Sequence, residues 1–235
     1  MGEFSRIVGV FFEPKKAFTD IAQRPSWIVP LILVILCAMG VTTAISQRIG
    51  WERVFRHQNE ASARYQQAPP EQRDQILAAQ MKFAAVGGYA GALLALPIMD
   101  IVIAAVLLGI AGGIMSGGMR FKQVFAIVCY SGLPGVISSI LAVVVIFLKN
   151  PDEFNLTNPL AFNVGAFMDP TSSSKFMYSL ASSMDLFVFW TIFLLATGLK
   201  AAAGKKLTFT GALVAVVVPW AILVLCKSAL AGAFS

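Results

Sequence analysis

The chain has 235 residues, of which 57% are hydrophobic and 13% are charged, and its formal net charge is +6. Soluble domains usually carry charged residues at roughly 25%, so this chain has too few of them to cover the surface of a soluble protein. The mean hydropathy of +0.76 points the same way. The composition excludes a disordered chain, a soluble globular enzyme and a disulfide-stapled secreted module. It favours an all-α, polytopic membrane protein.

The segment before the first apolar run, 1–26, predicts amphipathic helices that lie in the membrane interface. Apolar residues recur at helical spacing in its first half, and Pro14 suits the first turn of a second short helix. An apolar face with basic flanks is typical of an interfacial helix. An ordinary lead-in to the first span fits the pattern equally well. The candidate interfacial residues are Phe11, Phe12, Lys15, Lys16, Phe18 and Trp27.

Five apolar segments are each long enough to cross a bilayer as a helix. Their approximate bounds are 27–46, 84–115, 121–148, 179–199 and 208–230. The runs are continuously apolar, whereas the strands of a membrane barrel would alternate between apolar and polar residues. The sequence therefore predicts a five-span transmembrane domain over 27–235.

Two loops between the predicted spans are long. The polar loop 47–83 mixes acidic and basic residues and is divided by Ala68-Pro69-Pro70, which predicts a helical hairpin outside the bilayer. Its charge makes it a candidate docking surface for an unidentified protein partner. The semi-polar loop 149–178 interleaves asparagine, proline and serine with apolar residues. We expect this loop to fold back on the membrane surface.

The distribution of basic residues predicts the orientation. The segment before the first span, together with the second and fourth loops, holds nine Lys and Arg residues in about 42 positions; the first and third loops hold eight in about 67. The higher density favours the N-terminal side as cytoplasmic. Because the basic residues flank apolar segments, we expect them to meet anionic lipid headgroups and not nucleic acid.

Three ionisable residues lie within predicted spans, where charge is costly and therefore informative. Asp185 and Lys227 fall at similar depth in the last two spans, which predicts an ion pair between them. A structural clip is the favoured interpretation, and a proton or substrate relay is the alternative. Asp100 lies near the middle of the second span without a cation at its depth.

Counting the helical rise places Tyr130 and Ser131 of the third span near the level of Asp100, and Pro134 frees a backbone carbonyl close by. We therefore predict a polar node of Asp100, Tyr130 and Ser131. It is interpreted first as a hydrogen-bonded packing node, with a proton relay as the alternative.

Glycines at small-xxx-small spacing mark close helix approach in the second span. Packing within the monomer is favoured over a dimer face, and the oligomeric state stays open. The candidate packing glycines are Gly87, Gly91, Gly109 and Gly113, and the candidate kinks are Pro97, Pro134 and Pro219.

The sequence has no pair of zinc ligands, no Gly-x-Ser-x-Gly elbow and no paired carboxylates at one depth outside the membrane. We therefore expect a protein that is not an enzyme and that holds no metal and no cofactor.

Several stretches carry a family resemblance. They are FFEPKKAF from Phe11, RPSW from Arg24, GGMRFKQVF from Gly117, YSGLP from Tyr130, NPLA from Asn158 and DLFVFW from Asp185. Together they resemble the prokaryotic branch of the Yip-type family (Ypt-interacting protein one domain). The resemblance implies an integral membrane protein with five spans and a cytoplasmic N-terminus, in the bacterial cytoplasmic (inner) membrane.

In eukaryotes the family is linked to Rab-type GTPases, vesicle traffic and membrane shaping. The eukaryotic Asp-Leu-Tyr-Gly-Pro motif is not matched in this chain. The first functional hypothesis is a non-enzymatic membrane scaffold or shaping protein, in which the interfacial helix and the semi-polar third loop load one leaflet unequally. The alternative is a small transporter or channel that uses Asp100 and the pair Asp185 and Lys227.

Overall fold

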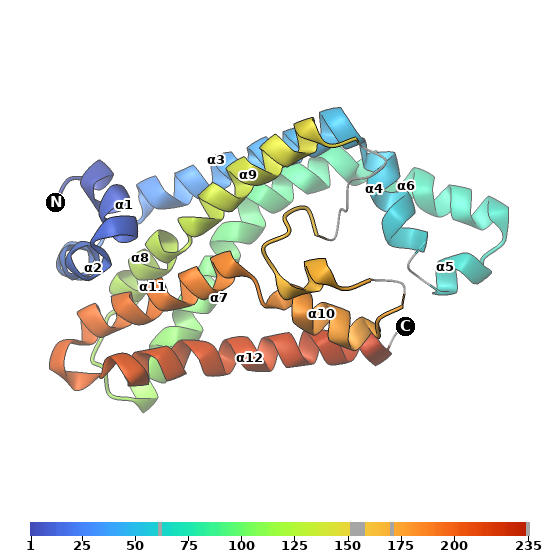
Figure 1. Cartoon of the computed structure of the whole chain (residues 1–235). Coiled ribbons are helices and arrows are strands. Elements are labelled where there is room, and N and C mark those ends of the chain that lie inside the picture. Colours follow the sequence, from blue (N-terminus) through green and yellow to red (C-terminus); the bar gives the residue numbers. More distant parts are fainter. Residues whose placement is uncertain (61–62, 151–157, 170–171, 234–235) are drawn as a thin grey trace.

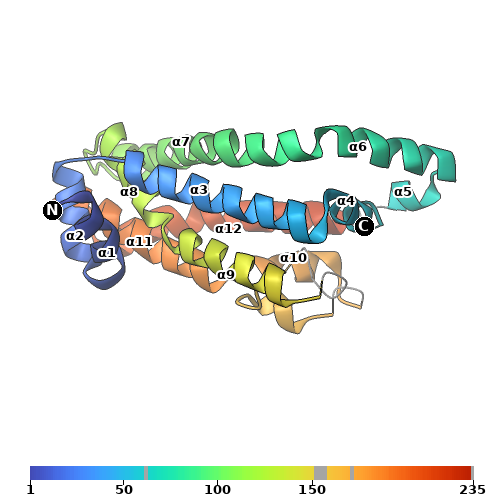
Figure 2. The ribbon, with the colours of Figure 1, turned by 90° about the horizontal axis from the view of Figure 1, so that it is seen from above.

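The computed structural model describes residues 1–60, 63–150, 158–169 and 172–233 of the chain, with backbone alone at 63 and 64. Within these residues the elements are helices, and the one β-feature is an isolated bridge between Asn163 and Asp185. The long helices run side by side as a bundle, and the two short N-terminal helices cover one end of it (Figures 1 and 2).

Within the described residues, five helical segments are long and apolar enough to cross a membrane, which confirms the predicted all-α architecture and number of spans. The segments are Ile28–Ile49, Pro70–Ile114, Phe121–Leu148, Leu186–Lys206 and Phe209–Ala233. Their component helices are α3 (Ile28–Ala44), η1 (Ile45–Ile49), α6 (Pro70–Ala90), η2 (Gly91–Ala95), α7 (Leu96–Leu107), η3 (Leu108–Ile114), α8 (Phe121–Ser131), α9 (Pro134–Leu148), α11 (Leu186–Ala203), η5 (Gly204–Lys206) and α12 (Phe209–Ala233).

The second segment is a continuous helix of 45 residues. At about 1.5 Å per residue it is roughly twice as long as a bilayer core of about 30 Å is thick. Its first half, α6, therefore projects beyond the neighbouring helices, as Figure 2 shows. Pro97 lies just after the π-helical turn η2. A wider turn suits this place because proline cannot donate the usual backbone hydrogen bond.

The prolines of the other spans differ in their effect. Pro134 lies in the first turn of α9 and follows the break that ends α8 at Ser131. Pro219, by contrast, lies inside α12, and the helix runs through it without interruption.

The fourth span begins later than the sequence predicts. Residues 179–183 belong to a separate short helix, α10 (Lys175–Ser183), and α11 begins at Leu186. The reason is Asp185, whose Oδ1 accepts hydrogen bonds from the backbone N–H groups of Phe187 and Val188 at 2.8 and 3.3 Å. A carboxylate that caps the first turn in this way starts a new helix.

The two long loops lie at the end of the bundle opposite α1 (Glu3–Phe12) and α2 (Pro14–Gln23) (Figure 1). Loop 47–83 contains α4 (Trp51–Glu60), α5 (Ala63–Gln67) and the start of α6. In the described part of loop 149–178, the backbone at Val164 and at Phe162 is hydrogen-bonded to Met184 and Leu186. This loop therefore folds back onto the start of the fourth span. Residues 151–157 and 170–171 of it lie outside the described part.

Candidate functional site

The most distinctive feature of the structure is the way the N-terminal helices dock on the bundle. Phe18 and Ile21 of α2 are fully buried against α8 and α11. The ring of Phe11 packs edge-on to Trp190 at 5.5 Å between centroids, and Trp27 packs in the same way on Phe125 at 5.3 Å. Of the predicted interfacial residues, Phe18 therefore belongs to the protein core and Phe11 and Trp27 contact protein side chains. The interfacial prediction is therefore wrong for Phe18, which is fully buried, whereas Phe11 and Trp27 stay partly exposed.

A cluster of polar side chains joins α1, α2 and the start of the first span. At its centre Arg6, the only basic residue of α1, is only 4% exposed. Its Nε donates to Asp20 Oδ2 at 2.7 Å, and its guanidinium also donates to Ser26 Oγ at 2.7 Å. The Ser26 hydroxyl donates in turn to Glu3 Oε1 at 2.7 Å. A buried guanidinium requires such a set of acceptors, because an unpaired buried charge is strongly destabilising.

The same cluster reaches the membrane-spanning bundle through Tyr130 of α8. The hydroxyl of Tyr130 donates to Glu3 Oε2 at 2.6 Å. Burial by itself would raise the pKa of Glu3, but the hydrogen bonds from Tyr130 and Ser26 and the charge of Arg6 outweigh it and hold that pKa below its ordinary value. We call Glu3, Arg6, Asp20, Ser26 and Tyr130 the polar network. It ties α1 and α2 to the bundle.

The opposite face of α1 is apolar and exposed. Phe4 is 79% exposed, Val8 39% and Phe12 82%. The three residues are spaced four apart, so they form one stripe along the helix. On α2, Lys15 and Lys16 are exposed. The N-terminal helices therefore present an apolar stripe and basic residues at one end of the bundle, the combination typical of an interfacial helix.

The polar residues predicted at the centre of the bundle do not form one node. Asp100 Oδ2 accepts a weak hydrogen bond from the Cys129 thiol, with 3.9 Å between sulfur and oxygen. Tyr130 turns away to Glu3, and the buried Ser131 hydroxyl has no hydrogen-bond partner among the described residues. Tyr130 and Ser131 are neighbours on α8 and therefore point in different directions, and Asp100 lies on α7. The predicted depth of a residue does not give the direction of its side chain around the helix.

Asp185 and Lys227 also have separate partners. Asp185 caps α11, and Lys227 Nζ donates to Ser183 Oγ at 3.3 Å. No ion pair joins the two in the described residues, so the predicted clip is not formed. The span boundary explains the difference, because Asp185 lies at the start of α11 and not six residues inside a span.

A comparison with known protein families matches the description "Yip1 domain" over residues 8–230. The chain belongs to the Yip1-domain family. The searches among curated proteins and among solved structures found no match. The matched range includes the first four spans, the fifth as far as Leu230 and the second half of α1. Val8 and Phe12 of the apolar stripe therefore lie inside the matched range, and Phe4 lies before it.

Glycine packing in this Yip1 domain occurs at other positions than predicted. A Cβ added at Gly87, Gly91 or Gly109 would meet no described atom within 4 Å, and at Gly113 only a backbone oxygen of the same helix at 4.0 Å. The predicted packing within the monomer is therefore absent at these glycines. Close approach occurs instead at Gly198 of α11, where an added Cβ would overlap Ile127 and come within 3.0 Å of Phe18.

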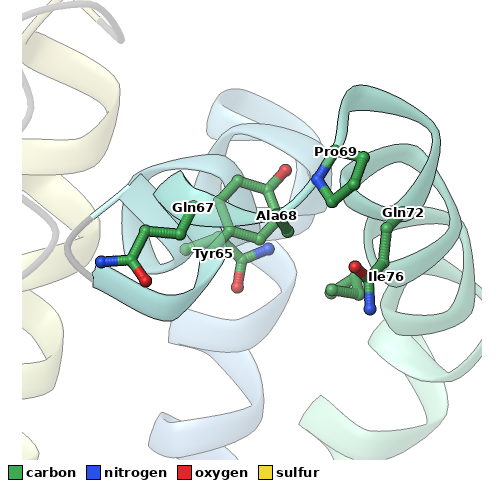
Figure 3. Close-up of a pocket in the computed structure, with 7 residues that line it drawn as sticks. Tyr65, Gln67, Ala68, Pro69, Gln72 and Ile76 are labelled. Carbon is green, nitrogen blue, oxygen red and sulfur yellow. The ribbon is translucent and has the colours of Figure 1, made fainter.

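Among the described residues, the best-formed cavities lie toward the two ends of the bundle, and Asp100 lines none of these. The largest, of about 680 Å³, lies between α5 and the first turns of α6 in loop 47–83 (Figure 3). Its labelled lining residues are Tyr65, Gln67, Ala68, Pro69, Gln72 and Ile76. A second cavity, of about 320 Å³, lies beside Asp185 and includes Ser138 and Asn163.

Sequence reasoning missed Glu3, Arg6, Asp20 and Ser26. The available signal was Arg6 itself, a single basic residue in an apolar stretch of α1, which the structure buries on the same helix face as Val10. A buried guanidinium needs a carboxylate partner, and the acidic residues of the segment 1–26 are only Glu3, Glu13 and Asp20.

Proposed function

We propose that this Yip1-domain protein is a non-enzymatic membrane scaffold that bends the bilayer by inserting its docked N-terminal helices into one leaflet. The observation that carries the proposal is the apolar stripe of Phe4, Val8 and Phe12, held outward at one end of the bundle by the polar network on the opposite face of the same helix. A shallow helix at one end of a spanning protein adds area to one leaflet only.

The energetics support insertion of the stripe. Burying a Phe or Val side chain in an apolar medium contributes about 1.5–3 kcal/mol, so the three residues together favour insertion by roughly 5 kcal/mol. Because the polar network fixes α1 to the bundle and the buried Phe18 fixes α2, the inserted helices cannot leave the protein easily. The protein then resists any bilayer shape that would expose the stripe.

The proposal places the N-terminal end in the cytoplasmic leaflet of a bacterial inner membrane. Its support is the basic residues gathered at that end, because cytoplasmic segments carry an excess of Lys and Arg. They are Lys15, Lys16, Arg24, Arg120, Lys122, Lys200, Lys205 and Lys206.

Two other functions have weaker support. A small transporter would draw on the cavity beside Asp185, but Asp100 does not line it. An adaptor would dock a soluble partner in the cavity of loop 47–83, whose lining residues carry no charge. The scaffold is favoured because it uses the exposed apolar stripe of α1 and explains why the polar network holds that helix on the bundle.

The test is reconstitution of the full chain into liposomes, followed by electron microscopy of vesicle shape. We expect the wild type to convert large vesicles into tubules or small vesicles, and Phe4→Ala/Phe12→Ala to lose most of this effect. The matched control is Phe147→Ala/Phe193→Ala, which removes two exposed rings from the spans and should retain bending. Equal loss in the control, or no bending by the wild type, would contradict the proposal.

The same liposomes separate the scaffold from the transporter. If the protein is a scaffold, Asp100→Asn should bend membranes like the wild type, and neither protein should carry protons above the lipid background. A proton flux that the wild type supports and Asp100→Asn abolishes would favour the relay instead.

A further inference from the structure

A cavity at the N-terminal end lies outside the polar network. Its volume is about 420 Å³, and it is formed where α2, α8 and α11 meet. Ala22 and Gln23 line it from α2, Arg120 and Gln123 from the start of α8, and Ala202 from the end of α11. None of these residues belongs to the polar network, so the cavity is available for a ligand while α1 and α2 stay docked.

The walls of the cavity are held by hydrogen bonds. Gln123 Nε2 donates to the carbonyl of Ala22 at 2.8 Å, which ties α2 to α8. Gln123 Oε1 accepts from the backbone N–H of Arg120 at 2.9 Å. With both ends of its amide in use, Gln123 fixes the backbone from which the Arg120 side chain extends. The cavity is therefore a built feature of the helix junction.

Two cations flank this cavity. Arg120 lines it directly. The ammonium of Lys206 lies against Gly118, another lining residue, because a Cβ placed on Gly118 would come within 2.7 Å of Lys206 Nζ. Gly118 has φ +66°, and its missing side chain leaves room for the amine. Neither cation has an acidic partner within 4.0 Å in the described part of the chain.

The acidic residues nearest to this end in the sequence are paired with other groups. The sequence has no Asp or Glu in 101–149, which includes α8, and none from 186 onward, which includes α11 and α12. On the N-terminal helices, Glu3 and Asp20 are bound to Arg6, and Glu13 is paired with Lys16 at 2.9 Å. The cavity therefore carries uncompensated positive charge, which favours an anionic ligand.

Aromatic side chains indicate the depth of the cavity in the membrane. Phe121, 42% exposed, opens α8 next to Arg120 and stacks on Phe125 at 5.8 Å, and Trp27 packs on Phe125 at the start of the first span. Aromatic residues gather where a span meets the headgroups. The cavity lies at the level where α8 begins and α11 ends, so it is at the end of the spans that the proposed function places in a headgroup layer.

We infer that this cavity binds the phosphate group of an anionic phospholipid in the leaflet at the N-terminal end. The planar guanidinium of Arg120 suits a phosphate bidentately, and Lys206 adds a point charge. The inference rests on the proposed function only in placing this end in a headgroup layer. It does not require that the protein bends the membrane.

The test is native mass spectrometry of the full chain in detergent, titrated with phosphatidylglycerol or with phosphatidylcholine of the same acyl chains. We expect the first phosphatidylglycerol to bind about tenfold more tightly than phosphatidylcholine, a preference worth about 1.4 kcal/mol. Arg120→Gln/Lys206→Gln should bring the two affinities close together. Lys15→Gln/Lys122→Gln removes the same charge from the same end outside the cavity and should keep the preference.

A second variant tests the cavity without changing its charge. Ala202→Leu places a larger side chain in the cavity at the end of α11 and should also reduce binding of phosphatidylglycerol. Unchanged binding in this variant and in Arg120→Gln/Lys206→Gln would overturn the inference, as would equal losses in the cavity and control pairs. The Ala202→Leu result stands even if the double charge variant fails to fold.

Inorganic phosphate separates a lipid site from a site for a soluble anion. At millimolar concentration it should neither bind measurably nor displace phosphatidylglycerol, because the lipid's acyl chains add apolar contacts. Binding of phosphate with displacement of the lipid would overturn the assignment to a headgroup. If the wild type prefers phosphatidylglycerol but does not bend vesicles, the proposed function alone is contradicted. If it bends vesicles but shows no lipid preference, this inference alone is contradicted.

Discussion

The hydroxyl of Tyr130 donates a hydrogen bond of 2.6 Å to Oε2 of Glu3, two residues that are 127 positions apart in the sequence. This contact joins the third span to the first turn of the chain. Because Glu3 is also hydrogen-bonded to Ser26, it connects α1 to the entry of the first span as well. The N-terminal helices are thus part of the folded bundle, and their apolar stripe is presented by a rigid support.

Tyr130→Phe removes one of the hydrogen bonds that hold α1. A hydrogen bond to a partly exposed carboxylate contributes about 1 kcal/mol, so the backbone amides of residues 3–12 should exchange with deuterium about fivefold faster. The matched control is Tyr89→Phe, which removes a hydroxyl bonded to Thr43 at 3.0 Å elsewhere in the bundle. Exchange in α1 should not change in the control; an equal increase there would argue against the contact with Glu3.

Docking of α1 and α2 should weaken in acid. The N-terminal amine and Arg6 hold the pKa of Asp20 below its ordinary value of 3.8, and the pKa of Glu3 is held below 4.5. Because the folded state favours the ionised carboxylates, their stabilising contribution is fully present above these ordinary values and is lost as the pH falls through the lower folded values.

The measurement is the thermal unfolding midpoint of the detergent-solubilised chain between neutral pH and about pH 3. The midpoint should fall for the wild type and fall less for Glu3→Gln/Asp20→Asn, which starts lower. Glu13→Gln/Glu52→Gln, which neutralises two exposed carboxylates, should follow the wild type. If the midpoint of Glu3→Gln/Asp20→Asn falls in acid as much as that of the wild type, groups outside the polar network cause the acid sensitivity.

Asp185→Ala should destabilise the protein by about 1 kcal/mol, because it removes the cap of α11. Asp185→Asn should cost little, since asparagine caps a helix as well as aspartate does. Combining Asp185→Ala with Lys227→Met should give the sum of the single effects to within about 0.5 kcal/mol. The free energies of unfolding are to be measured by titration with a denaturing detergent. A non-additive effect of the two substitutions would indicate that Asp185 and Lys227 form an ion pair, contrary to the structure.

Gly198→Ala should destabilise the bundle by about 1–3 kcal/mol, because the added methyl group overlaps Ile127 and crowds Phe18. Gly87→Ala is the control: its Cβ meets no described atom within 4 Å, and alanine is the better helix former by about 1 kcal/mol. The thermal midpoint should fall for the first variant and stay or rise for the second. A fall for Gly87→Ala would point to a contact with a second copy of the chain.

The number of spans could be predicted from the sequence because it depends on a local property. A run of about twenty apolar residues has to lie in hydrocarbon wherever the rest of the chain goes. The break before Pro134 could be predicted for the same reason, since it follows from proline's own geometry. The start of the fourth span could not, because Met184 and Leu186 are apolar and only the capping geometry of Asp185 separates α10 from α11.

By itself the sequence determined that this is an all-helical, five-span membrane protein with an amphipathic, basic N-terminal segment. Only the tertiary structure decided which face of that segment meets the protein: Arg6 and Phe18 turn inward, and Phe4 and Phe12 turn outward. The tertiary structure also decided that Tyr130 donates its hydrogen bond to Glu3, whereas Asp100 accepts one from Cys129. The physical reason is that a hydropathy pattern gives the depth of a side chain, whereas its direction around the helix and its partner depend on segments that are distant in the sequence and meet only after folding.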